Sequence, residues 1–182
     1  QPDTLCNRWV SAKEAAANDN AYLMQFSAVC FLHARELARM HSPMKSRAIG
    51  LVQAAWGGTR IEAWMSQEAI AATKIPVVKT KRVDENTASA LYNAMVAPFN
   101  PLSVRAAVWY QGEANGDEPV AQKTAYYSAY LAAMIADWRA RKMMGDFAFM
   151  SMMIAPSIGA TESHLNGHLN GTCSNTPGGS GG

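Results

Sequence analysis

The sequence has 182 residues, of which 49% are hydrophobic and 16% charged, with a formal net charge of +2. This length suits one domain with a real core, and the composition excludes a disordered chain as a whole. The small net charge gives no electrostatic basis for a nucleic-acid partner. No apolar run approaches the roughly 20 residues that a membrane-spanning helix requires, so we expect no membrane partner.

The first half of the chain contains one predicted helix, one predicted strand and a second, shorter helix. Large apolar residues at helical spacing predict an amphipathic helix within 22–41. The run "AIGLVQAA" (48–55), followed by two glycines, predicts a strand buried on both faces. Ser66 is a predicted N-cap for a short helix, and the basic stretch that follows, within 74–86, is predicted to be an exposed connector.

The second half alternates strands and helices. Residues 104–110 predict a second buried strand, which ends directly in the polar stretch "QGEAN". A long helix is predicted from Pro119 to about Met143, and 147–154 is a third strand candidate. The apolar stripe of this helix consists of Tyr127, Tyr130, Leu131, Met134, Ile135 and Trp138. Before these elements, "ALYNAMVAPF" predicts a helical turn. Strands that alternate with helices predict an α/β fold with a parallel sheet covered on both faces.

The composition changes at Pro156, after which Gly, Ser, Asn and Thr replace the large apolar residues. We therefore predict a domain over 1–156 and a disordered, low-complexity tail over 157–182. The sequence shows no signal peptide and begins with Gln1 instead of Met. This start predicts either that an upstream piece was removed or that the sequence is a fragment.

Two polar, glycine-bearing loops, "WGGT" and "QGEAN", are predicted at the carboxyl ends of strands, where α/β proteins bind ligands. At Gly57 and Gly58 the backbone can approach a bound group and donate an N–H to an oxyanion, or it simply forms a turn with positive φ. The amides of Gln111 and Asn115 can donate to a developing negative charge, or they hold a turn. Glu113 orients a partner or is solvated.

The cysteines and the late histidines predict no cofactor and no metal. Cys6, Cys30 and Cys173 lack metal-type spacing and cannot all pair within one chain, so the redox compartment stays open. His164 and His168 are four residues apart but lie in the low-complexity segment without a third ligand.

Four segments together resemble the sialate O-acetylesterase family of SGNH hydrolases: "FSAVCFLHARELARM", "IGLVQAAWGGTRIEAW", "LYNAMVAPFNPLSVRAAVWYQGEAN" and "YLAAMIADWR". The resemblance runs from about Trp9 to Pro156. It implies a three-layer α/β/α sandwich with a parallel sheet, flavodoxin-like as in SGNH proteins and incomplete at both ends here. It also implies hydrolysis of O-acetyl esters on sialic acids or related sugars without a metal.

The resemblance also assigns site residues. It implies an oxyanion hole built from Gly58 and an amide, with Gln111 the first choice and Asn115 the second, and substrate contacts from Gly57 and Glu113. Family members use a serine from a "GQSNM"-type motif and a base from a "DxxH"-type motif. This sequence contains neither motif, and its early histidines, His33 and His41, fall in the first predicted helix.

The sequence therefore predicts a fragment of a carboxylic ester hydrolase that lacks nucleophile and base, with O-acetylated sialic acid or another acetylated sugar as its partner. The alternative is a catalytically dead module that binds acyl sugars. Phosphate or nucleotide binding at "WGGT" is a third class, but the glycine pair fits neither the dinucleotide fingerprint nor the P-loop. A secreted or lysosomal location fits the family, and the sequence leaves the location open.

Overall fold

The computed structural model describes residues 9–17, 24, 26–40, 48–77, 83–116, 120–141 and 145–154. Contacts divide the chain into two compact units, Gln1–Ala55 and Trp56–Gly182, and each is described by itself. The predicted tail over 157–182 lies outside the described residues, as do His41, His164 and His168. The division into a domain over 1–156 and a tail stays a prediction.

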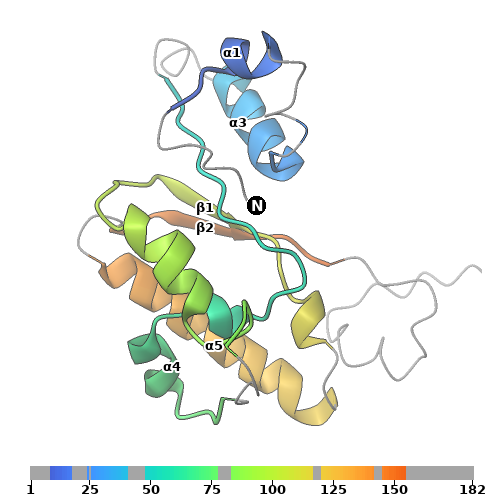
Figure 1. The fold of residues 1–182 in the computed structure, drawn as a ribbon, viewed down its shortest axis with the longest axis vertical. Helices are drawn as coiled ribbons and strands as arrows, with labels where there is room; N and C mark the ends of the chain where they lie inside the picture. Colours follow the sequence, from blue (N-terminus) through green and yellow to red (C-terminus); the bar gives the residue numbers. More distant parts are fainter. Residues whose placement is uncertain are drawn as a thin grey trace, which may run out of the picture. The chain divides into compact units, whose positions relative to one another are not determined.

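Among its described residues, the first unit contains the helices α1 (Ala12–Ala17) and α3 (Ala28–Met40), drawn in blue in Figure 1. The helix predicted within 22–41 is confirmed over the range of α3. Ser27 precedes this helix, and its Oγ accepts a hydrogen bond of 3.3 Å from the backbone N–H of Cys30. The Cys30 side chain is half-buried, and burial raises the pKa of its thiol.

The strand predicted over 48–55 is wrong. The described backbone there forms no strand, and the apolar side chain of Val52 is 39% exposed. A strand buried on both faces needs hydrogen-bonded neighbours along its backbone and side chains over each face. Within the described residues of the first unit, this segment has neither, so its apolar composition alone does not make it a strand.

The second unit is built on a parallel strand pair joined by a helix. Strand β1 (Ala106–Trp109) lies beside β2 (Ala148–Ser151), with Ala106 opposite Ala148 and Trp109 opposite Ser151. Helix α5 (Val120–Ala140) connects them and packs along the pair (Figure 1). A parallel pair requires such a crossover. The α/β class is confirmed, as are the predicted strands at 104–110 and 147–154 and the helix between them.

Short helical segments cover the same core. They are the 3₁₀ turn η1 (Ile61–Trp64), helix α4 (Gln67–Thr73), the π-helical turn η2 (Tyr92–Val96), and the 3₁₀ turns η3 (Ala97–Phe99) and η4 (Glu113–Asn115). The helical turn predicted for "ALYNAMVAPF" is confirmed as η2 and η3, which end before Asn100.

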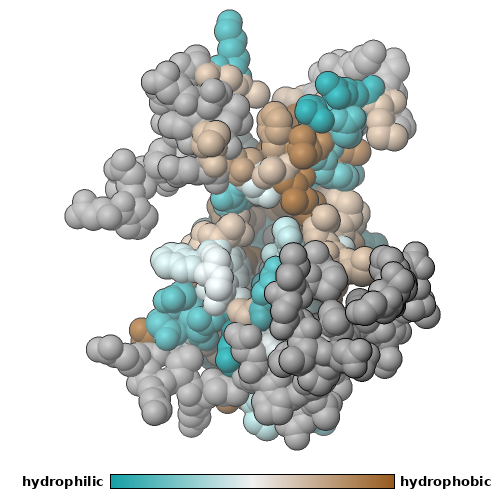
Figure 2. Space-filling view, turned by 90° about the vertical axis from the view of Figure 1, so that its right-hand side faces the viewer, coloured by the Kyte–Doolittle hydropathy of each residue, from teal (hydrophilic) through white to brown (hydrophobic). Residues whose placement is uncertain are grey.

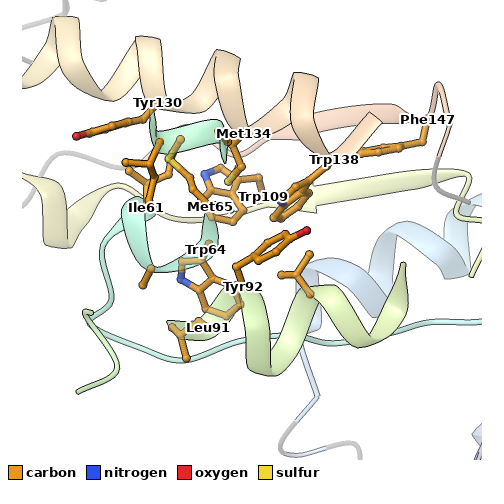
Figure 3. Packing of buried hydrophobic residues seen from close by; sticks show 14 residues of the cluster. Ile61, Trp64, Met65, Leu91, Tyr92, Trp109, Tyr130, Met134, Trp138 and Phe147 are labelled. Atoms are coloured by element: carbon orange, nitrogen blue, oxygen red, sulfur yellow. The ribbon is translucent and has the colours of Figure 1, made fainter. Parts of the chain in front are cut away.

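Trp109 of β1 lies at the centre of the hydrophobic core, surrounded by side chains of α5, η1 and η2 (Figure 3). Its ring meets Trp64 edge-on at a centroid distance of 6.3 Å and Trp138 at 5.9 Å. Edge-to-face contacts of this kind stabilise aromatic pairs beyond simple area burial. Within 126–140 of α5, the buried side chains are Tyr130, Met134 and Trp138, which belong to the apolar stripe that the sequence predicted.

Large apolar side chains also reach the surface of both units, as the brown and tan atoms of Figure 2 show. In the second unit the exposed large hydrophobic side chains include Val83, Leu102 and Met153. No helix within the described ranges combines the length and the apolar character that crossing a bilayer requires.

Ser66 caps α4, and its removal tests the local stability of the unit. The buried Ser66 Oγ accepts a 3.0 Å hydrogen bond from the backbone N–H of Ala69. We expect Ser66→Ala to lower the free energy of unfolding by about 1 kcal/mol, because an N–H in the first turn loses its acceptor. Urea denaturation measures the change. Ser151→Ala at an exposed position is the control, and an equal loss in both variants would contradict the capping role.

Candidate functional site

The structure brings the two predicted polar loops together. Gln111 lies two residues beyond the end of β1, and its Nε2 donates a 2.9 Å hydrogen bond to the backbone oxygen of Thr59. The backbone N–H of Ile61 donates in turn to Asn115 Oδ1 at 2.9 Å. The "WGGT" loop does not follow a strand, so side-chain amides, rather than a shared strand end, place it beside "QGEAN".

Gln111 and Asn115 differ in the hydrogen atoms they have left to donate. Gln111 Nε2 donates both to Thr59 O and to Asn115 Oδ1, at 2.9 and 2.8 Å. A primary amide has two N–H groups, so these two bonds use both. Asn115 Nδ2 donates at 2.9 Å to Glu62 Oε2. Within the described residues, its second N–H has no further acceptor.

Glu62 holds the far side of this network and was not among the predicted site residues. Its side chain belongs to η1 and is only 9% exposed. A buried carboxylate requires hydrogen-bond donors, and the Asn115 amide supplies one. The signal in the sequence is an acidic residue inside the otherwise apolar stretch "IEAW".

Tyr127 of α5 was also missed, because the sequence placed it only in the apolar stripe of that helix. Its hydroxyl donates to Gln111, with Oε1 at 2.8 Å and the backbone oxygen at 2.9 Å, and it accepts from Trp109 Nε1 at 3.1 Å. Burial raises the pKa of the Tyr127 phenol, and the charges of Glu113 and Glu62 raise it further, against the Trp109 hydrogen bond. The phenol is therefore protonated at neutral pH and acts as a donor.

Glycines give both loops backbone conformations that other residues rarely adopt. Gly58 has φ of 75°, and Gly112 has φ of 150°. A Cβ on Gly112 would lie 2.5 Å from Ile154 Cδ1, whereas Gly57 and Gly58 have open space around them. Both glycines of "WGGT" are exposed, as is Glu113 at the start of η4. The predicted substrate contacts of Gly57 and Glu113 stay predictions.

The arrangement can stabilise negative charge. The backbone N–H of Gly58 and the second N–H of Asn115 have no acceptor among the described residues, and fixed donors of this kind stabilise an oxyanion. No serine, cysteine or histidine side chain takes part in the recorded bonds that join these two loops. In the part of the chain that the structure describes, no three His, Cys, Asp or Glu residues gather as a metal site would require.

These features define a class. A parallel βαβ unit with amide donors just beyond the carboxyl end of a strand is the arrangement of an α/β protein that binds its ligand at that edge.

Comparisons with known proteins give the family. The family model described as "Carbohydrate esterase, sialic acid-specific acetylesterase" matches residues 4–174. Sialate O-acetylesterases of Pongo abelii and Homo sapiens are each 36% identical over 125 residues, which are 66% of this chain and 22% of theirs. The crystal structure of a carbohydrate acetylesterase from Xanthomonas citri matches with a TM-score of 0.55 and 31% identity, over 71% of this chain and 26% of that one.

The chain belongs to the carbohydrate esterase family of sialic acid-specific acetylesterases. Its SGNH-like α/β fold is the one that the resemblance implied. The chain spans about a quarter of the length of the relatives that it matches, 22% of the human protein and 26% of the Xanthomonas citri one.

The backbone of Gly58 provides a test of the "WGGT" turn. We expect Gly58→Ala to lower the free energy of unfolding by about 1–2 kcal/mol, because its φ of 75° is costly for any residue with a Cβ. Gly57→Ala is the matched control, since its φ is ordinary and its Cβ position is open. Chemical denaturation measures both. Equal stabilities for the two variants would show that the turn does not require positive φ.

The Gln111 amide is tested by an isosteric change. In Gln111→Glu an oxygen replaces Nε2 and faces two acceptors, Thr59 O and Asn115 Oδ1, so we expect a loss of about 2–3 kcal/mol in unfolding free energy. Gln67→Glu makes the same chemical change at an exposed position in the first turn of α4. If the two variants unfold at the same denaturant concentration, the amide of Gln111 does not hold the loops together.

Proposed function

We propose that the protein to which this chain belongs is a carboxylic ester hydrolase that removes O-acetyl groups from sialic acids or related sugars. Family membership supports the reaction class. The observation that carries the proposal is the Asn115 amide, which three hydrogen bonds hold in place while one N–H stays available. A rigid amide donor beyond a strand end is what acyl transfer needs to stabilise its intermediate.

The chain supplies the oxyanion side of this reaction. When a serine attacks the acetyl carbonyl, the carbonyl oxygen becomes negatively charged, and N–H groups aimed at it lower the barrier. Gly58 and Asn115 provide these N–H groups. Gln111, whose two N–H groups are already used, is a support for Asn115 and not the donor itself. Gly57 and Glu113 lie beside these donors in sequence and contact the sugar.

The nucleophile and the base are not part of this sequence, which contains neither the "GQSNM"-type nor the "DxxH"-type motif. Oxyanion donors without an attacking group leave the ester intact. We therefore expect the isolated chain to show no hydrolysis of an aryl acetate or of O-acetylated sialic acid, and no labelling by a serine-directed fluorophosphonate. The assays use the purified chain, with a sialate O-acetylesterase as the positive control.

The complete reading frame tests the proposal directly. The gene is sequenced before the codon for Gln1 and after that for Gly182, and its whole product is assayed on O-acetylated sialic acid. We expect this product to hydrolyse the ester and Asn115→Ala to lower kcat on the order of 100-fold, the effect of losing one oxyanion donor. Gln67→Ala, at an exposed position of α4, is the control.

Two results would each contradict one part of the proposal: the absence of a nucleophile from this chain, or the esterase activity itself. Hydrolysis by the isolated chain would reveal a nucleophile within these residues, and fluorophosphonate labelling with mass spectrometry would locate it. If the product of the complete reading frame lacks both the serine motif and esterase activity, the alternative is favoured. That alternative is a module that binds acetylated sugars without cleaving them.

A further inference from the structure

We infer that Tyr127 is a positioning residue, which orients the amides of Gln111 and Asn115 so that one Asn115 N–H faces the ligand. The assignment of a catalytic use to that N–H rests on the proposed function. The orientation itself rests on a continuous chain of hydrogen bonds from Trp109 through Tyr127, Gln111 and Asn115 to Glu62.

The two ends of this chain fix its direction. The indole N–H of Trp109 can only donate, so the Tyr127 hydroxyl accepts it and directs its own single proton to Gln111. The Glu62 carboxylate can only accept, so it fixes the Nδ2 side of Asn115. Between a donor-only end and an acceptor-only end, the amide groups have one orientation that satisfies every bond.

Reversal of either amide shows how strong this constraint is. A flipped Gln111 would turn Oε1 toward Thr59 O and Asn115 Oδ1, so that three acceptors would face one another. A flipped Asn115 would turn Oδ1 toward the Glu62 carboxylate. Unsatisfied or opposed polar groups in a buried setting cost far more than one good hydrogen bond contributes.

Tyr127 is the link that α5 contributes to this network. Its hydroxyl has one proton, which the side-chain and the backbone oxygen of Gln111 share as acceptors. Trp109, which precedes it in the chain of bonds, is fixed by aromatic contacts with Trp64 and Trp138. Removal of the hydroxyl would separate the amides from the core while leaving the aromatic packing in place.

The first measurement needs no activity. In the chain labelled with ¹⁵N on glutamine and asparagine side chains, hydrogen exchange of the Gln111 and Asn115 amide protons is followed by NMR. We expect Tyr127→Phe to speed exchange of both Gln111 protons about tenfold, the effect of losing one hydrogen bond. The backbone N–H of Met152, which donates to Trp109 O, reports on the fold and should keep its exchange rate.

The matched control is Tyr126→Phe, the same loss of a hydroxyl on the neighbouring residue of α5, where the side chain is 37% exposed. We expect no change in either side-chain amide in this variant. Unchanged Gln111 exchange in Tyr127→Phe, or an equal change in both variants, would overturn the orienting role of Tyr127.

The second measurement uses the product of the complete reading frame. A positioning residue acts on the transition state, so we expect Tyr127→Phe to lower kcat about 10- to 100-fold while KM stays nearly constant. Tyr126→Phe is again the control and should keep its kcat. An equal fall of kcat in both variants would indicate a general loss of folded enzyme and not a loss of positioning. Altered amide exchange with an unchanged kcat would overturn the positioning role. If the product of the complete reading frame has no esterase activity, the proposed function is contradicted. The exchange measurement still tests whether Tyr127 orients the amides of Gln111 and Asn115.

Discussion

Trp109 joins the two kinds of interaction on which the second unit depends. Its ring fills the middle of the core against Trp64 and Trp138, and its indole N–H begins the hydrogen-bond chain that ends at Glu62. A buried indole N–H costs free energy unless it meets an acceptor, and for Trp109 the acceptor is the Tyr127 hydroxyl, which itself has a proton to donate. The hydrogen bond of the Trp109 N–H is therefore the first in a series of bonds that runs from the core to the surface loops.

Sequence patterns predicted several elements correctly from residue type and spacing. The Ser66 cap, the stripe of α5 and the two strands that α5 connects follow from residue type and spacing, and all are present. The segment 48–55 failed because an apolar run reports only a preference for burial. A strand also needs partners along its backbone, and these depend on the arrangement of distant parts of the chain.

The sequence predicted which loops form the candidate site, but not the hydrogen bonds between their side chains. The polar loops were found because glycines and amides are conspicuous after apolar runs. The sequence does not show which N–H groups of Gln111 and Asn115 are already hydrogen-bonded, since this depends on which acceptors lie around each amide. Tyr127 shows the same limit: its position in an apolar stripe was correct, but the stripe says nothing about its hydroxyl.

The hydrogen bonds of this network also differ in the number of residues between donor and acceptor, and therefore in the chain entropy that is lost when each one forms. The bonds that Tyr127 of α5 makes with Trp109 of β1 and with Gln111 just after it span 18 and 16 residues, whereas those that reach the "WGGT" segment and η1 span 52 to 54. Closing the longer loops costs about 1 kcal/mol more in chain entropy. The entropy of loop closure therefore favours contact between α5 and β1 before η1 docks onto them. The hydrogen bonds that hold the amides of the proposed site are completed only by this second step.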